Sequence, residues 1–326
     1  MLVCLISERC ESGPLISIKP TMSDVDNGSP VDEVCLLDMD ACYETFDKDG
    51  DGQLNFDEFR LICKALFRND KGHIYPLPED RARHVFQIFD KNDDGFIDKE
   101  EFTFCWNHWI KVIVRPVSAF LVVDVQNDFI SGTLNISKCN AQQDGSEVVE
   151  PINRLLETVP FECVFYSLDW HPPDHVSFID NVHMRELHVS SPVLDGAVKV
   201  YKGTNSEVDS YSVFWDNKKL TDTNLSMQLR ARGVTDIYIC GLAYDVCVGA
   251  TIADALAIGY RSVLVDDASR GVDLADIEKT KATILTNHGV IVDSEQVLAM
   301  VEGRDRRPEL GYKLAMELKH AMEDQD

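Results

Sequence analysis

Three side chains of different chemistry, a carboxylate, an amine and a thiol, each follow an apolar run with the composition of a buried strand. They are Asp124, Lys202 and Cys247, and Cys247 also stands where a helix should begin. A thiol beside a helix N-terminus and a cation should have a pKa below its usual value of about 8.5. A nearby carboxylate could accept the thiol proton and later deliver it to a leaving group. Taken singly, these residues have ordinary explanations as a cap, a solvated amine and a small buried side chain, but together they could perform nucleophilic catalysis.

A different set of candidate residues occurs twice in the first third of the sequence, in two stretches whose first residues are 43 positions apart. Each stretch has oxygen-bearing side chains at positions 1, 3, 5 and 12 and a glycine at position 6, which is the pattern of a calcium loop. The short side chains turn inward around a hard cation, the glycine permits the tight turn, and the last glutamate can bind through both oxygens. Counting the backbone carbonyl at position 7, the expected calcium ligands are Asp47, Asp49, Asp51, Gln53 and Glu58 in the first stretch and Asp90, Asn92, Asp94, Phe96 and Glu101 in the second.

These two stretches resemble the loops of the EF-hand family, arranged as a paired lobe. Leu54 and Ile97, at position 8 of each loop, suit the short strand that pairs two such loops. Two acidic turns without an ion are the alternative, and two complete ligand sets argue against it. Mg²⁺ competes for the same oxygens and is held less well because it prefers six ligands. Whether the lobe is a sensor or a structural buffer stays open.

The elements that must hold these residues differ between the two parts of the chain. Around the loops, apolar residues have helical spacing in residues 36–46, 59–67, 82–89 and 102–110, and Pro116 ends the last helix. Beyond it, apolar runs typical of buried parallel strands alternate with helical stretches. The runs are 119–124, 163–166, 198–201, 237–241, 262–266 and 289–292, and the helical stretches are 147–156, 220–232, 247–257 and 276–286. The predicted fold class is therefore α/β, a doubly wound, mostly parallel sheet preceded by an all-α EF-hand lobe, with ligands bound at the carboxyl ends of the strands.

The motifs of the second part, over about residues 116–311, resemble the isochorismatase-like cysteine hydrolases and most closely the nicotinamidases. An EF-hand lobe ahead of this domain resembles the animal members. The stretches that carry the resemblance are Asp124–Phe129, Ser167–Phe178, Lys202–Gly203 and Gly241–Thr251.

The resemblance implies a role for each matching residue. Asp124, Lys202 and Cys247 would form the catalytic triad. The backbone N–H groups of Ala243 and Cys247 would form the oxyanion hole, beside a cis peptide between residues 242 and 243. Phe129 would pack on the substrate ring.

The resemblance also implies a divalent metal, often zinc, which the residues matching Asp169 and His171 would hold. One family segment, reading Trp-Pro-x-His-Cys, is missing between these ligands and the catalytic lysine, and the stretch that should contain it is shorter than usual. In the family that segment supplies the third metal ligand and a second aromatic wall for the substrate. His175 is the nearest substitute as third ligand, with His183 and His188 behind it as histidines that an ordinary surface would also explain.

The leading hypothesis is an enzyme that hydrolyses nicotinamide to nicotinate and ammonia through a cysteine thioester, in NAD salvage, with an attached calcium-binding lobe. Two alternatives stay open. One is a catalytically impaired form that acts as a calcium-binding or interaction protein. The other is a sister hydrolase acting on an isochorismate, ureido or carbamoyl substrate. The Asp169-Trp-His171 motif argues against the second, because those relatives generally lack that metal site.

Composition limits the other functions of the chain. It has 326 residues, with 31 Lys+Arg against 56 Asp+Glu and a net charge of −25, and residues 1–110 hold 23 of those acids and 11 of the bases. This balance argues against binding to nucleic acid or to anionic membrane surfaces. The sequence contains no apolar run of about 18 residues, so we expect no membrane-spanning helix. Ten cysteines without a Cys-x-x-Cys pair indicate a reducing compartment, the cytoplasm or also the nucleus, and a homo-oligomer stays open.

We expect four segments along the chain. They are a flexible leader at 1–33, the EF-hand pair at 34–114, the hydrolase domain at 116–311 and a C-terminal tail at 312–326. Residues 304–308, which include three arginines, show no recognisable chemistry.

Overall fold

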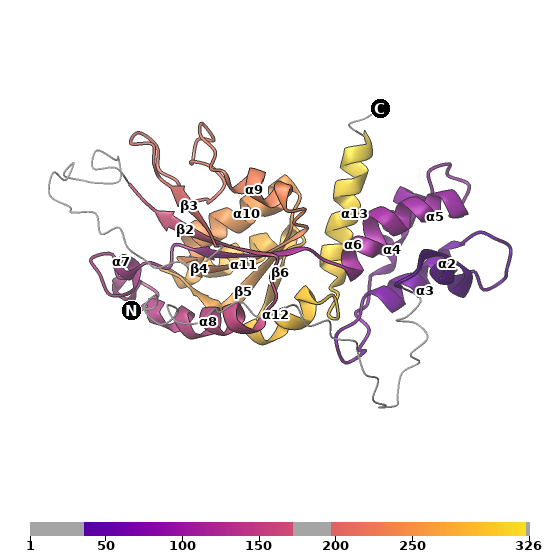
Figure 1. Cartoon of the computed structure of the whole chain (residues 1–326), viewed down its shortest axis with the longest axis horizontal. Coiled ribbons are helices and arrows are strands. Elements are labelled where there is room, and N and C mark those ends of the chain that lie inside the picture. The colour runs from indigo at the N-terminus through magenta and orange to yellow at the C-terminus, as the bar shows by residue number, and fades with distance from the viewer. Residues whose placement is uncertain (1–35, 172–196, 324–326) are drawn as a thin grey trace, which may run out of the picture.

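The computed structural model describes residues 36–171 and 197–323, so the predicted leader lies outside the described residues. A helical lobe and a helix-covered sheet lie side by side, with the last helix upright between them (Figure 1). No helix in these two ranges has the length and apolar character needed to cross a membrane.

The helical lobe contains the two predicted loops between pairs of helices. Its helices are α2 Met39–Phe46, α3 Phe56–Leu66, α4 Glu79–Phe89 and α5 Lys99–Cys105, the last continuing through the π-helical turn η1 Trp106–Ile110 into α6 Lys111–Val114. Asn55 and Asp98 cap α3 and α5, and in each cap the glutamate three residues later bonds back to the cap residue. That glutamate is also the last predicted ligand of its loop, so the same side chain caps the helix and completes the predicted ligand set.

Within the described residues, the second part is a six-stranded sheet in which all the pairings are parallel. Its strands are β1 Ser118–Val123, β2 Cys163–Asp169, β3 Val198–Lys202, β4 Asp236–Leu242, β5 Arg261–Arg270 and β6 Val290–Val292, in the order β3-β2-β1-β4-β5-β6. Strands β1 and β4 are buried along their whole length, as continuous apolar runs require. The order reverses between β1 and β4, which is where a doubly wound sheet opens a ligand site. The predicted fold class is confirmed.

Helices cover both faces of the sheet. Helices α9 Leu225–Ala231, α10 Gly249–Ile258 and α11 Leu274–Thr286 contribute to the core of one face, and α8 Val149–Thr158 and α12 Ser294–Val301 to that of the other (Figure 1). The prediction of a helix over residues 220–232 was wrong about where the helix starts, because α9 begins only at Leu225. Thr221 and Thr223 instead bond back to Asp216 and Val213, which holds the preceding residues in a turn.

One glycine fixes how closely the two central strands approach. Gly241 in β4 has a φ of 125°, and a Cβ there would lie 2.1 Å from the carbonyl oxygen of Val123 in β1. No other residue type could occupy that position without separating the strands.

The last helix, α13 Pro308–Glu323, crosses the expected division between hydrolase domain and tail without a break. It packs on α4 and η1 of the helical lobe and on β5 of the sheet. The division at residue 311 stays a prediction, but the described part of the tail is a packed helix.

Candidate active site

The structure brings the three predicted catalytic side chains together at the carboxyl ends of strands β1, β3 and β4. The Lys202 Nζ lies 2.9 Å from Asp124 Oδ2 and 3.4 Å from Cys247 Sγ. Asp124 is fully buried and Lys202 is 1% exposed. The thiol, the carboxylate and the ammonium that contacts both therefore form one buried cluster.

Two further contacts fix the position of Lys202. Its Nζ donates to Asp169 Oδ1 at 2.8 Å and to the Ser210 carbonyl at 2.7 Å. Burial alone would lower the pKa of Lys202, but the charges of Asp124, Cys247 and Asp169 raise it above the ordinary value. The side chain is therefore a permanent ammonium, which can orient charge but cannot act as a base.

Asp124 is held by the neighbouring strand. It follows β1 with a φ of 48°, and Ser167 of β2 donates to its Oδ1 at 2.6 Å while accepting from its backbone N–H at 3.1 Å. The other carboxylate oxygen, Oδ2, lies 2.9 Å from the Lys202 ammonium. Burial raises the pKa of Asp124, and the charge of Lys202 opposes that rise only in part. A carboxylate in this state accepts a proton readily.

Cys247 lies in the π-helical turn η4 Tyr244–Val248, directly before α10, as its predicted place at a helix start requires. The expectation of a lowered thiol pKa was wrong. Burial and the charge of Asp124 raise the pKa of Cys247 well above its ordinary value, and Lys202 opposes them only in part. The cation is present, but the loss of solvent and the adjacent carboxylate outweigh it. Cys247 is therefore a neutral thiol at rest.

The backbone around the nucleophile forms a tight turn. The N–H groups of Val246 and Val248 donate to the Ala243 carbonyl at 3.0 and 3.1 Å. The peptide between Leu242 and Ala243 is cis, so that prediction is confirmed. The Asp245 carboxylate accepts hydrogen bonds from the backbone N–H groups of Val272 at 2.9 Å and Asp273 at 2.8 Å. Because these residues directly precede α11, the bonds connect the turn to the start of that helix.

The two predicted metal ligands lie beside the triad. Asp169 Oδ2 and His171 Nε2 are 3.1 Å apart, and His171 Nδ1 lies 3.0 Å from the Gly203 carbonyl, to which it can donate. The hydrogen bond with Asp169 and its charge raise the pKa of His171, although burial opposes them. The third candidate, His175, lies outside the described residues.

Phe129 is placed less directly. It belongs to the short helix α7 Asn127–Ile130, and its half-buried ring packs against the core on the α8 face of the sheet. In the described part of the chain no contact between Phe129 and the triad is recorded, so its role against a substrate ring stays a prediction.

Sequence reasoning missed two side chains that position the site. Ser167 holds Asp124, and Gln126 accepts the Asp169 N–H at 2.8 Å through its Oε1. Both lie inside the stretches that carried the resemblance, two residues from a predicted site aspartate. Their polar character at buried strand ends was the signal that could have identified them.

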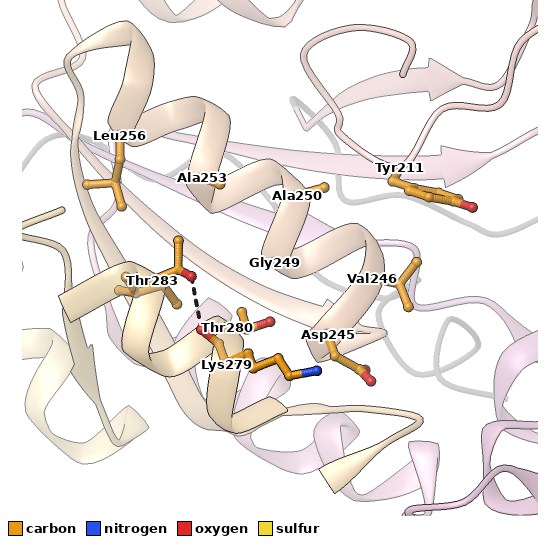
Figure 2. A pocket seen from close by; sticks show the side chains of 11 residues that line it. Tyr211, Asp245, Val246, Gly249, Ala250, Ala253, Leu256, Lys279, Thr280 and Thr283 are labelled. Carbon is orange, nitrogen blue, oxygen red and sulfur yellow. Dashed lines mark hydrogen bonds between the residues drawn. The ribbon is translucent and has the colours of Figure 1, made fainter. Parts of the chain in front are cut away.

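A cavity of about 470 Å³ lies behind the nucleophile turn, between α10 and α11 (Figure 2). Asp245 and Val246 of the turn and the ring of Tyr211 line one end, and apolar side chains of α10 line the other. Asp124, Lys202 and Cys247 are not among the residues that line this cavity.

In the first predicted calcium loop, three of the expected ligands cluster. The nearest ligand atoms of Asp47, Asp49 and Glu58 lie within 4.8 Å of one another. Leu54 and Ile97 pair as an antiparallel bridge with two hydrogen bonds of 2.9 Å, which confirms that prediction.

In the second loop, Asp90 accepts from the N–H groups of Asp94 and Gly95, and Glu101 from those of Lys91 and Asp98. The loop backbone is thus organised around the carboxylates.

Comparisons with known proteins agree with this geometry. The isochorismatase domain matches residues 118–296, more than half of the chain, and the EF-hand domain pair matches residues 39–104. The nicotinamidase of Escherichia coli is 33% identical over 187 residues, covering 49% of this chain and 85% of that protein. The nicotinamidase of Acinetobacter baylyi is 30% identical over 48% of this chain and 82% of its own. The solved structure of an Acinetobacter baumanii nicotinamidase shares 28% identity over 56% of this chain and 98% of that one, with a TM-score of 0.48. At that score the family assignment rests on the sequence matches alone.

Proposed function

The chain belongs to the isochorismatase family and is a nicotinamidase-type hydrolase with an EF-hand pair, and from this premise we propose that it converts nicotinamide to nicotinate and ammonia. The observation that carries the proposal is the Lys202 ammonium, which lies between a buried carboxylate and a buried thiol at the sheet's switch point. This arrangement pairs a nucleophile with a base that can also return the proton.

The first step is attack by Cys247 on the carboxamide carbon. Asp124 accepts the thiol proton as Sγ bonds to carbon, and the electron pair of the carbonyl moves to its oxygen. The raised pKa of Asp124 makes it a stronger acceptor than a solvated aspartate. Lys202 stabilises the negative charge, whether that charge is on the carboxylate or on sulfur.

The developing oxyanion needs hydrogen-bond donors. The N–H groups of Ala243 and Cys247 are the candidates, since both belong to the tight turn that presents the nucleophile. Each such donor contributes about 3–4 kcal/mol to the transition state in hydrolases where one has been removed.

The second half of the reaction returns the proton. Asp124 delivers it to the amide nitrogen, the C–N bond breaks, and ammonia leaves a thioester on Cys247. Water then adds to the thioester carbonyl while Asp124 accepts one of its protons. The C–S bond breaks, the proton returns to sulfur, and nicotinate is released.

Asp169 and His171 could supply two of the three protein ligands of a divalent metal such as zinc at the edge of this site. Asp169 and His171 offer ligand atoms 3.1 Å apart, a spacing suited to two ligands each about 2.1 Å from one ion. The Gly203 carbonyl fixes the histidine tautomer that leaves Nε2 for the metal. A bound ion would orient the pyridine nitrogen of the substrate.

The test is ammonia release from nicotinamide by the purified chain, with Zn²⁺ or Fe²⁺ added. Turnover that requires both the metal and Cys247 would support the proposal. A folded chain that releases no ammonia would favour the impaired, calcium-binding alternative. Turnover of a ureido or carbamoyl compound but not of nicotinamide would favour the sister-hydrolase alternative.

We also propose that both loops of the EF-hand pair bind Ca²⁺, because each has a full set of oxygen ligands. Isothermal titration should give two sites per chain with calcium and weaker binding with Mg²⁺. A single site, or equal affinity for the two ions, would contradict this.

Nicotinate as product would place the chain in NAD salvage, and we propose a cytoplasmic or nuclear location. The seven cysteines in the described ranges are free thiols, a state that suits a reducing compartment. Recovery of the protein in a secretory fraction of fractionated cells would argue against this location.

A further inference from the structure

Helix α13 is part of the hydrophobic core of the EF-hand lobe. Ala315 is fully buried in that core, and five neighbouring apolar residues of the helix pack against it. Those five residues are Tyr312, Leu314, Met316, Leu318 and Met322. The apolar face of the lobe is therefore covered by the C-terminal helix of the chain itself, which also contacts β5 of the sheet.

The fit at the start of α13 is close. The buried indole of Trp109 donates to the Gly311 carbonyl at 2.8 Å. A Cβ at Gly311 would lie 2.4 Å from the ring of Phe67, so only glycine allows the helix to approach this closely. Next to it, His84 of α4 contacts the Tyr312 hydroxyl at 2.9 Å. Polar and apolar contacts thus fix one position of α13 on the lobe.

Arg306, just before α13, connects the C-terminal segment to the EF-hand lobe. It does so at the C-terminal end of α3, the helix that follows the first predicted calcium loop. Its side chain is buried, and its Nε and Nη2 donate to the carbonyls of Leu66 and Ala65 at 2.5 and 3.5 Å. These carbonyls end α3, where a cation is favourable because the helix C-terminus carries partial negative charge. The first turn of the same helix contains Glu58, the last ligand of the first loop. One helix of 11 residues therefore has the calcium loop at one end and Arg306 at the other.

We propose that calcium binding to the EF-hand pair and docking of α13 on that pair stabilise each other, so that calcium tightens the attachment of the C-terminal helix. Without a cation, the clustered carboxylates of Asp47, Asp49 and Glu58 repel one another and weaken the lobe. A cation removes that repulsion and stabilises the surface on which α13 rests. The coupling is reciprocal: the factor by which calcium strengthens docking of α13 equals the factor by which docking of α13 strengthens calcium binding.

Hydrogen–deuterium exchange of the full chain tests this proposal, which rests on the calcium binding proposed above but not on the hydrolase reaction. At a calcium concentration about 100 times the dissociation constant, exchange in residues 308–323 should slow by up to about a hundredfold relative to chelator. Slowed exchange in the loops with unchanged exchange in α13 would overturn the coupling alone. No change in the loops would overturn the calcium assignment as well.

A pair of variants tests the reverse direction. Arg306→Lys keeps the charge but loses the planar donors, and we expect it to lower calcium affinity about fivefold or more. Arg154→Lys is the matched control, since Arg154 lies on α8 of the hydrolase domain, away from the EF-hand pair, and pairs with Glu150 one turn earlier. Equal calcium affinities of the two variants would overturn the proposal. Gly311→Ala, which pushes α13 from Phe67, should lower the affinity in the same direction by an independent route.

Discussion

The EF-hand lobe and the hydrolase domain use aspartate for chemistry in opposite ways. In the first loop, Asp49 and Asp51 are exposed and accept hydrogen bonds from backbone N–H groups of the loop itself. In the hydrolase domain, Asp124 is fully buried, and its partners Ser167 and Lys202 come from two other strands. A solvated carboxylate suits a cation that arrives from water, whereas a desolvated one with a raised pKa suits proton transfer.

The same contrast explains what the sequence could predict. All ligands of a calcium loop lie within twelve consecutive residues, so their spacing alone identified both loops. Asp124 and Cys247 are far apart in sequence and meet only because β1 and β4 are neighbours. Their places after buried strands suggested nucleophilic catalysis, but their assignment to one triad came from family resemblance, because spacing carries no information about two distant strands.

The largest effect that would test this contrast is expected from Cys247→Ala. Removing the nucleophile should lower kcat for nicotinamide by about 10⁴-fold or more, since the remaining groups cannot form the thioester. Calcium affinity should stay unchanged, because no calcium ligand is touched. Steady-state kinetics and calcium titration measure both. Cys139→Ser, which alters an exposed thiol, is the control and should retain full turnover.

The next effect is expected from Asp124→Asn. The amide cannot accept the thiol proton, so kcat should fall by about 10³-fold while the shape of the site is kept. Rapid-quench measurement of the first turnover would locate the loss in the acylation step. Asp276→Asn, on the exposed first turn of α11, is the matched control. Similar rates for the two variants would remove Asp124 from the mechanism.

A smaller effect, confined to the other half of the molecule, is expected from Glu58→Gln. Loss of the bidentate carboxylate should weaken calcium binding at the first loop by about 30-fold. Turnover at saturating calcium should change little, because Glu58 is not part of the hydrolase site. Glu44→Gln, an exposed residue of α2 outside the loop, should leave both properties unaltered. Loss of turnover in Glu58→Gln at saturating calcium would show that the hydrolase reaction depends on the EF-hand lobe.

The smallest effect is expected from Ser167→Ala, which removes the hydroxyl that orients Asp124. We expect kcat to fall about tenfold with little change in KM, because the base is misplaced and substrate binding is not. Ser167→Thr keeps the hydroxyl and should restore most of the rate. A rise in KM at constant kcat would instead assign Ser167 to substrate binding.

The features that the sequence did not predict depend on tertiary contact. Burial around Cys247 raised the pKa that a helix start and a cation were expected to lower. Arg306 lies in a segment without recognisable chemistry, yet it is buried against the end of α3. In both cases the deciding neighbours are distant in sequence, so local pattern could not reveal them. Leu54 and Ile97 were predicted correctly because the loop motif itself fixes their pairing.

Gly241 has a consequence for the evolutionary history of the chain. The strands that it holds together are the ones that carry Asp124 and lead to Cys247, and any side chain at this position would collide with the Val123 carbonyl. A single substitution of Gly241 would damage both folding and turnover. No variant at this position could therefore lose turnover and keep its stability. We therefore expect glycine to persist at this position in natural variants of the chain. Saturation mutagenesis with separate selections for soluble protein and for turnover would show both losses at the same substitutions.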